Sequence, residues 1–386
     1  MTAAAKRWAW AEIDLDAVRH NVGVLREVSA PAEVWAVVKA DGYGHGGVAV
    51  ARAALEAGAS GLCVALVQEG VELRRAGIDA PVLVLSEQPP EQLDELVRER
   101  LEATVYRPGS IAALAAAALA ADVRDVGVHV KIDTGMHRVG ARPERAVQLV
   151  EAVRSAAPAL AIRGVATHLA TADEPGHPAV AAQLDTFASV LAGLDAAGLR
   201  PPLVHVANSA AALAVPQARF SLVRAGIAVY GIEPGPGVAD RCRGLRPALA
   251  LKARVSWVQR VRRGEGISYG LRHVFDRDTT VATVPLGYAD GVARRLFETG
   301  GALLVGGVRR PIVGVVTMDQ LMVDCAESEV AIGDEVVLIG AQDGPHGADV
   351  IRAEEWADRL GTIGYEIVCG ISPRIPRLYL GGVQRA

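Results

Sequence analysis

Between residues 34 and 223 of this 386-residue chain, short apolar runs rich in β-branched residues alternate with stretches of helical periodicity. The expected strands are Val34–Val38, Gly61–Ala65, Pro81–Leu85, Glu102–Tyr106, Val126–Ile132, Ile162–Thr167, Leu203–Val206 and Ser221–Val223. The expected helices between them include Val48–Ala57, Glu69–Ala76, Ile111–Ala121 and Glu144–Ser155. Apolar strands separated by helices are typical of parallel strands buried on both faces. Eight such units predict an α/β fold of the (β/α)8 TIM-barrel type. The alternative is an open doubly wound sheet, but no GxGxxG follows the first strand.

The sequence changes character near Leu245, where short alternating runs replace the long helical patterns. The expected strands are Leu249–Val258, Thr280–Val284, Ala302–Leu304, Ile312–Val316, Leu321–Val323 and Glu335–Ile339, with a helix near Ala353–Leu360. This pattern predicts a β-rich C-terminal domain. The Pro- and Gly-rich segment Glu233–Gly237 is the candidate linker. We therefore assign residues 1–240 to the barrel and residues 241–386 to the β-rich domain, with packing of residues 1–10 on the second domain as an alternative.

Composition and charge exclude several classes of protein. The 40 Lys and Arg residues against 44 Asp and Glu residues argue against a nucleic-acid-binding protein. The longest apolar run, Ile111–Ala121, is too short to span a bilayer, and the N-terminus lacks a signal-peptide pattern. The four cysteines contain no CxxC pair, so neither a disulfide framework nor a metal site is expected. We expect a cytoplasmic protein that binds neither membrane nor nucleic acid.

Polar residues follow the predicted strands at their C-terminal ends, where barrel enzymes carry their chemistry. They are Lys39 after the first strand, Lys131, Asp133 and Arg138 at the fifth, His168 at the sixth, Asn208 and Ser209 after the seventh, and Arg224 and Gly226 at the eighth. A lysine desolvated in a barrel mouth is nucleophilic and can form a Schiff base with an aldehyde cofactor. The alternative is a lysine that extends from a strand end into solvent.

The loops after strands seven and eight of such barrels commonly bind phosphate. Asn208 and Ser209, together with Gly226 and Ile227, would offer a hydroxyl and backbone N–H groups there. A reactive lysine beside a phosphate site is what pyridoxal 5'-phosphate (PLP) requires. Arg224 would reach the far side of the cofactor ring, where a cation keeps the pyridine nitrogen unprotonated and restrains transamination. Alternatively, Arg224 pairs with a surface acid.

Five of the seven tyrosines neighbour a glycine. These five are Tyr43, Tyr230, Tyr269, Tyr288 and Tyr365. Their phenol groups could act as acids, bases or phosphate ligands. Each ring could equally cover bare glycine backbone as a packing element.

Taken together, these motifs resemble those of the bacterial alanine racemases, a family of fold-type III PLP enzymes. The resemblance extends from Ala11 to Arg377. The motifs that carry it are Ala36–Gly46, Asp133–Arg138, Thr167–His168, His205–Ser209, Arg224–Ile227, Ser268–Gly270, Gly287–Gly291 and Met318–Gln320.

The resemblance implies PLP as cofactor and a homodimer with composite active sites. Lys39 would bind PLP covalently and act as one base, and Tyr269 of the partner subunit would be the other base on the opposite face. The implied cofactor-binding residues are Lys39, Tyr43, His168, Asn208, Ser209, Arg224, Gly226, Ile227 and Tyr365. The implied substrate-binding residues are Arg138 and Met318, with Lys131, Tyr288 and Asp319 in supporting or entrance positions. Lys131 matches a position that is often N-carbamylated.

The implied activity is interconversion of L-alanine and D-alanine, which supplies D-alanine for peptidoglycan. Alternatives are an amino-acid racemase of broad specificity, and a protein that binds PLP or cycloserine with little turnover. A decarboxylase of this fold needs a catalytic cysteine beside an acid, and the only such pair, Asp324 and Cys325, lies in an expected strand. The chain departs from the family pattern at Val315, where we expect a basic residue, and at Thr317, where cysteine or serine is common.

Overall fold

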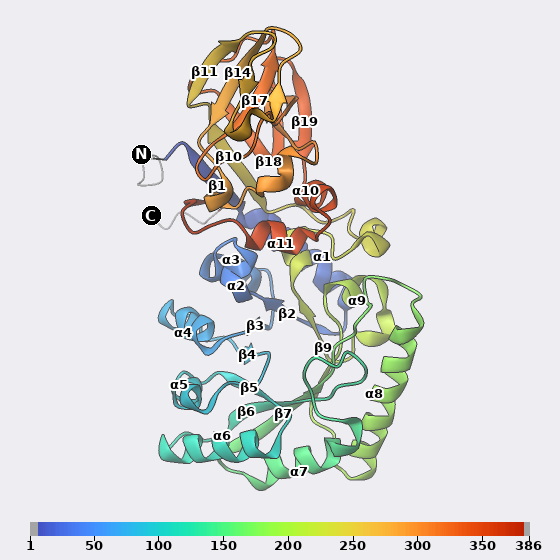
Figure 1. Ribbon diagram of the computed structural model, residues 1–386. Helices are drawn as coiled ribbons and strands as arrows, with labels where there is room; N and C mark the ends of the chain where they lie inside the picture. The colour runs from blue at the N-terminus through green and yellow to red at the C-terminus, as the bar shows by residue number, and fades with distance from the viewer. Residues whose placement is uncertain (1–6, 382–386) are drawn as a thin grey trace. The chain divides into compact units, whose positions relative to one another are not determined.

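The computed structural model describes residues 7–381 and divides into two compact units (Figure 1). One unit comprises residues 18–246, and the described part of the other comprises residues 7–17 and 247–381. Within the described residues, no helix has the length and apolar character needed to cross a membrane.

The first unit is an eight-stranded parallel barrel, as predicted. Its strands pair in the order β8-β7-β6-β5-β4-β3-β2-β9. The bounds are β2 (Glu33–Val37), β3 (Gly61–Val64), β4 (Val82–Val84), β5 (Glu102–Val105), β6 (Val126–Lys131), β7 (Leu160–Ala166), β8 (Leu203–His205) and β9 (Leu222–Ala225). Backbone bonds from Ser221 N–H to Val204 C=O (3.0 Å) and from Arg224 N–H to Ala207 C=O (2.9 Å) join the β9 segment to the β8 segment and close the ring.

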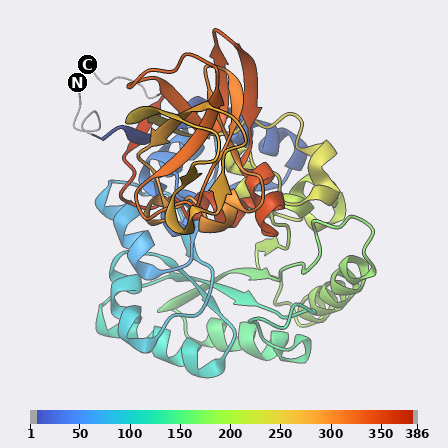
Figure 2. The ribbon, with the colours of Figure 1, turned by 45° about the horizontal axis from the view of Figure 1, so that its top comes forward.

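Helices surround these strands, as Figure 2 shows. They are α1 (Leu15–Ser29), α2 (Lys39–Tyr43), α3 (Gly47–Glu56), α4 (Val67–Arg75), α5 (Leu93–Arg98), α6 (Pro108–Ala120), α7 (Ala146–Ser155), α8 (Pro178–Ala196) and α9 (Ser209–Ala214). In α7, Leu149, Val150 and Val153 are buried at helical spacing, so one apolar stripe faces the core. Strands β3 and β4 are buried at every position, which explains why their sequences are continuously apolar.

The second unit is rich in β-strands, as predicted. A sheet of order β16-β15-β18-β10-β1-β20 carries β19 on β18, and β11-β14-β17 and β12-β13 form two smaller sheets. The strands are β1 (Ala9–Asp14), β10 (Leu249–Arg254), β11 (Trp257–Val261), β12 (Gly266–Ile267), β13 (His273–Val274), β14 (Thr279–Val284), β15 (Ala302–Val305), β16 (Val308–Pro311), β17 (Leu321–Ala326), β18 (Glu335–Gly344), β19 (Gly347–Ile351) and β20 (Arg377–Leu380). Its helices are α10 (Ala353–Leu360) and α11 (Gly364–Cys369).

Two strand predictions in this unit are wrong. The expected strand Ile312–Val316 is a loop, because Gly314 adopts a left-handed φ of +73° that a strand does not allow. The expected strand Leu249–Val258 is divided into β10 and β11, which belong to different sheets. The chain changes sheet at Val255 and Ser256, whose N–H groups bond to Asp334 and Thr283 respectively.

The units divide after Arg246, a few residues beyond the boundary that we expect from the sequence. The Asn21 side chain accepts from Arg246 N–H (2.7 Å) and donates to Arg246 C=O (2.8 Å), which ties this segment to α1. Within Glu233–Gly237, a Cβ at Gly237 would meet the Asp173 carbonyl oxygen at 2.3 Å, so the candidate linker is packed closely. Of residues 1–10, residues 1–6 lie outside the described residues, and Ala9 and Trp10 belong to β1.

Candidate active site

Lys39 begins a left-handed turn directly after β2. Ala40, Asp41, Gly42 and Tyr43 all have φ between +51° and +60°. Such a run is costly for residues other than glycine, so it persists only where other contacts enforce it. The Gly42 N–H bonds to Val38 C=O (2.8 Å), and the Asp41 carboxylate accepts from Gly47 N–H (2.7 Å). The turn therefore holds Lys39 at the C-terminal end of a barrel strand.

The Glu69 carboxylate reinforces this turn. One of its oxygens accepts from Ala40 N–H at 2.6 Å, and the other accepts from the N–H groups of Ala65 (2.8 Å) and Leu66 (3.1 Å). Glu69 thus connects the lysine turn after β2 to the loop after β3. Sequence reasoning missed the structural roles of Glu69 and Asp41, because a carboxylate that bonds to backbone carries no distinctive motif.

The expected phosphate-binding groups lie together in the barrel unit. Ser209 Oγ accepts from Gly226 N–H (2.8 Å) and from Ala228 N–H (3.3 Å). A Cβ on Gly226 would lie 2.6 Å from the Tyr43 hydroxyl, so only glycine lets that hydroxyl approach. The Ile227 N–H has no partner within residues 7–381, which leaves a donor for an anion. Asn208 instead caps α9, where its side chain accepts from Ala211 N–H (3.0 Å).

Arg224 lies buried at the end of β9, and the alternative of a surface ion pair is wrong. Its guanidinium contacts His205 Nδ1 (2.6 Å), His168 Nδ1 (3.2 Å), and the carbonyls of Thr167 (2.9 Å) and Val206 (3.1 Å). Burial lowers the pKa of Arg224 to about 10, so the group stays cationic at neutral pH. Sequence reasoning singled out His205 only as a residue near the seventh strand and missed its bond to Arg224.

A group of cations surrounds His168 and Lys131. Burial, Arg224 and Lys131 hold the pKa of His168 well below its usual value, so this imidazole is neutral. Because Arg224 can only donate, Nδ1 of His168 accepts and Nε2 carries the proton. Burial, followed by the charges of Arg224, Arg138 and Lys39, lowers the pKa of Lys131 to about 8. The cluster favours an anionic ligand.

Arg138 lies on an exposed loop after β6. The Asp133 carboxylate shapes the loop by accepting from the N–H groups of Gly135 (3.0 Å), Met136 (3.1 Å) and His137 (3.0 Å). Within the described part of the chain, Arg138 makes no hydrogen bond or ion pair. Its guanidinium is therefore available to a ligand carboxylate.

The second unit carries the other expected residues on exposed loops. Tyr269 is 74% exposed and Met318 is 52% exposed. Tyr288 N–H donates to Thr317 C=O, and Ala289 N–H donates to Met318 C=O, both at 3.0 Å. Ser268 Oγ donates to Val315 C=O at 2.7 Å, which fixes the Tyr269 turn to the same loop. The side chain of Val315 is buried, so this position packs within the unit and presents no cation.

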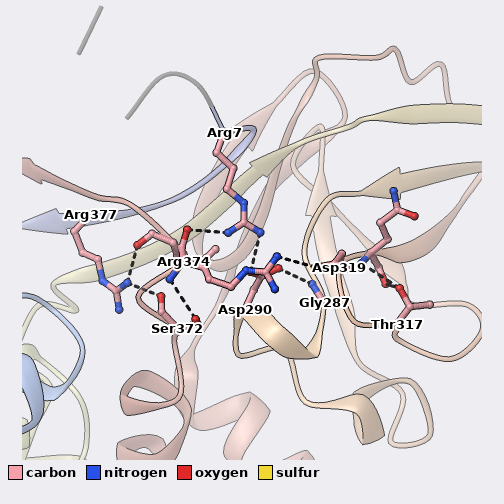
Figure 3. Close-up of polar contacts among 10 residues, drawn as sticks. Arg7, Gly287, Asp290, Thr317, Asp319, Ser372, Arg374 and Arg377 are labelled. Carbon is pink, nitrogen blue, oxygen red and sulfur yellow. Dashed lines mark hydrogen bonds and ion pairs between the residues drawn. The ribbon is translucent and has the colours of Figure 1, made fainter. Parts of the chain in front are cut away.

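A buried carboxylate organises these loops (Figure 3). Asp290 is fully buried, accepts from Gly287 N–H (3.1 Å) and lies 2.7 Å from Arg7 Nη2. Arg374 lies 3.5 Å from Asp290 and donates to Asp319 at 2.7 Å. Sequence reasoning quoted Asp290 and Arg374 inside motifs but gave them no role, since their contacts join segments far apart in the chain.

Two further sequence hypotheses concern this unit. Tyr365 lies near the start of α11 and is half-buried. Cys325, the candidate thiol for a decarboxylase, lies fully buried on β17, and burial raises its pKa to about 11. A buried, protonated thiol is a poor acid–base group at neutral pH, which argues against that alternative.

Known proteins match both units. A family model described as "Alanine racemase, N-terminal domain" matches residues 13–234, and one described as "Alanine racemase, C-terminal domain" matches residues 248–379. An alanine racemase from Symbiobacterium thermophilum is 47% identical over 380 residues, covering 97% of this chain and 98% of that relative. The crystal structure of alanine racemase from D-cycloserine-producing Streptomyces lavendulae matches with a TM-score of 0.90 at 42% identity, covering 98% of both chains. A histidine racemase from Leuconostoc mesenteroides subsp. sake matches with a TM-score of 0.88 at 28% identity, covering 97% of this chain and 99% of that one.

Proposed function

The chain belongs to the alanine racemase family and is an isomerase that interconverts L-alanine and D-alanine, and from this premise we propose a two-base reaction. Lys39 and Tyr269 are the two bases, acting on opposite faces of the α-carbon. Racemisation removes a proton from one face and returns one to the other. Two bases can accomplish this without either one moving around the substrate.

The observation that carries this proposal is the distribution of the site residues. Lys39, Arg224, Ser209 and His168 belong to the barrel unit, whereas Tyr269 and Met318 are exposed on loops of the other unit. Exposed aromatic and thioether side chains on ordered loops are suited to a partner surface. We propose a homodimer in which Tyr269 of one subunit completes the site of the other.

The barrel residues fit PLP. Lys39 would bind the aldehyde carbon, while Ser209, Tyr43 and the N–H groups of Gly226 and Ile227 would hold the phosphate. Arg224 would face the pyridine nitrogen. The chemistry that the cofactor supplies when bound is electron withdrawal, which makes the α-proton of the amino acid acidic.

The remaining residues orient the substrate and the second base. Arg138 binds the substrate carboxylate, and Lys131, partly neutral near pH 8, is available for carbamylation and would then orient Arg138. The Met318 carbonyl is occupied by Ala289 N–H, so its own N–H, unpaired within residues 7–381, is the backbone group that meets the carboxylate. The neutral His168 directs Nε2–H toward the Tyr269 oxygen and stabilises its deprotonated form.

Hydrogen exchange in deuterium oxide tests the assignment of the two bases. Tyr269→Phe should abolish exchange of the α-hydrogen of L-alanine far more than that of D-alanine, because Lys39 still serves the D-face. Tyr379→Phe, on β20, is the matched control and should leave both rates unchanged. Equal losses of the two exchange rates in Tyr269→Phe would contradict the assigned faces.

The covalent role of Lys39 has a separate test. Borohydride reduction followed by peptide mass spectrometry should place the cofactor mass on Lys39. Lys39→Ala should lose this adduct, whereas Lys252→Ala, at an ion-paired lysine elsewhere, should retain it. A persistent adduct in Lys39→Ala would remove Lys39 from its role.

Substrate breadth is the open alternative, because a histidine racemase shares the fold. One methylene in a pocket is worth only about 1–3 kcal/mol, so selectivity must come from excluding larger side chains. Circular dichroism of L-alanine should decay to zero with enzyme and PLP. The same assay with serine and histidine measures the breadth. Rescue of a D-alanine auxotroph tests whether the activity supplies peptidoglycan, and turnover of L-alanine excludes a protein that only binds PLP or cycloserine.

A further inference from the structure

The barrel interior contains a row of four polar side chains that extends from Arg224 away from the cofactor-facing end. Arg224 Nη1 lies 2.6 Å from His205 Nδ1. His205 Nε2 lies 2.8 Å from Nδ1 of His129 on β6, and His129 Nε2 lies 2.7 Å from Oε2 of Glu102 on β5. Both imidazoles are at most 1% exposed, while the Glu102 side chain is 18% exposed. Contacts alone therefore connect a buried cation to a carboxylate that reaches solvent.

The chemistry of arginine sets the direction of every bond in this row. A guanidinium has donors but no acceptor, so His205 Nδ1 must accept and its proton must reside on Nε2. His205 Nε2–H then donates to His129 Nδ1, which leaves the His129 proton on Nε2, directed at the Glu102 carboxylate. Burial and the charge of Arg224 keep the pKa of His205 well below its usual value, which agrees with a neutral imidazole. One protonation pattern satisfies all four groups.

The strands leave room for this row. A Cβ on Gly164 of β7 would lie 2.4 Å from His129 Nδ1, and a Cβ on Gly127 of β6 would lie 2.9 Å from the Glu102 Cγ. Neither glycine has a positive φ, so backbone conformation does not require glycine at these positions. Glycine weakens a strand interior, and its presence here marks close approach by another group. Two strand positions are thus reserved for the side chains of Glu102 and His129.

We propose that Glu102 and His129 are positioning residues for Arg224, fixing the His205 tautomer that receives the guanidinium. This inference rests on the proposed placement of Arg224 at the cofactor ring. If His129 carried its proton on Nδ1, it would oppose the Nε2–H of His205. If His205 in turn moved its proton to Nδ1, two donors would face each other across 2.6 Å and displace Arg224. The Glu102 carboxylate prevents this sequence by holding the His129 proton on Nε2.

The far end of the row opens on a cleft at the N-terminal ends of β5, β6 and β7. The cleft has a volume of about 500 Å³, and Glu102 lines it together with Arg100, Asp122, Arg124, Asp125 and Arg163. Asp122 lies in the same cleft but outside the row. It therefore provides a matched carboxylate control for Glu102.

Nitrogen-15 NMR of histidine-labelled holoenzyme tests the protonation pattern without any activity measurement. Both His129 and His205 should show an unprotonated Nδ1 and a protonated Nε2, unchanged between pH 6 and pH 9. Signals are assigned by their loss in His129→Gln and His205→Gln. An imidazolium, or an Nδ1–H tautomer, at either residue would overturn the proposal.

Variants at Glu102 test the positioning role. Glu102→Gln keeps an acceptor oxygen and should retain kcat within about twofold, whereas Glu102→Leu leaves a buried N–H unpaired and should lower kcat about tenfold with KM little changed. Glu102→Leu should also form more pyridoxamine phosphate per turnover and show mixed His129 tautomers. Asp122→Asn should match the wild type in all three measurements.

Two outcomes are distinct. If the wild type racemises alanine with the expected face-specific exchange but Glu102→Leu behaves as wild type, the positioning role is wrong and the proposed function stands. If Glu102→Leu does not fold, the tautomers in the wild type still decide the question. If the exchange experiment with Tyr269→Phe fails, the proposed function is wrong, whatever the tautomers show.

Discussion

Lys131 is the residue whose ionisation is most directly linked to its proposed role. Its pKa of about 8 lies below the ordinary lysine value, first because of burial and then because of Arg224, Arg138 and Lys39. Only the neutral amine reacts with carbon dioxide, and the neutral fraction rises as pH increases through this value. Carbamate formation should therefore increase between pH 7 and pH 9, as measured by ¹³C NMR with labelled bicarbonate.

A matched lysine provides the control for this experiment. Lys252 lies 3.0 Å from Glu12 and 3.6 Å from Glu335, so its charged form is stabilised. Lys131→Gln should remove the carbamate signal and Lys252→Gln should leave it intact. A signal that persists in Lys131→Gln would place the modification elsewhere.

Gly226 tests the phosphate-binding cluster at a single atom. In Gly226→Ala, the new Cβ would lie 2.6 Å from the Tyr43 hydroxyl, so the tyrosine must move away. We expect PLP affinity to fall about tenfold, which corresponds to about 1.4 kcal/mol, in equilibrium dialysis. Gly193→Ala, where the nearest atom lies 4.0 Å from the new Cβ, should bind PLP as the wild type does. Equal affinities of the two variants would remove Gly226 from the cofactor site.

At the scale of elements, the barrel was predictable and the β-rich unit was less so. Strands such as β3 and β4 are buried on both sides, so their sequence is apolar throughout and their ends are marked by Gly, Pro or charge. The two-residue strands β12 and β13 carry no periodic pattern. Ile312–Val316 has the composition of a strand, but Gly314 turns it into a loop. Local pattern therefore identifies long buried strands and fails where a single φ angle decides.

The left-handed turn after β2 is an element that periodicity cannot reveal. Asp41 supports it through one bond to Gly47 N–H at 2.7 Å. Asp41→Ala should lower the free energy of unfolding by about 1 kcal/mol in urea, since the exposed side chain loses one hydrogen bond to backbone. It should also slow the covalent attachment of PLP to Lys39, because the turn positions this lysine.

Asp41→Asn is the matched variant, since its amide oxygen can still accept from Gly47 N–H. It should restore the stability and the attachment rate to nearly wild-type values. If Asp41→Asn were as destabilised as Asp41→Ala, charge and not the hydrogen bond would be the stabilising feature.

At the scale of the whole molecule, the chain presents its site residues in two sets. Motif order along the sequence predicted both sets, because each motif follows a strand or lies beside a glycine turn. It could not reveal the groups that hold each set in place, such as Asp290 with Arg7 at 2.7 Å, since those contacts join distant segments. Which subunit supplies which set is a property of the assembly.

Complementation between two inactive variants tests that assembly. Lys39→Ala and Tyr269→Phe homodimers should each be nearly inactive, because every site lacks one base. If Tyr269 acts in the partner's site, a mixed dimer contains one site with both defects and one intact site. Random exchange of subunits makes half of the dimers mixed, so the mixture should recover about a quarter of wild-type activity. If both bases came from the same chain, every site in the mixture would lack one base and activity would not recover. Recovery should therefore appear only after subunits exchange, and a covalent crosslink that blocks exchange should prevent it.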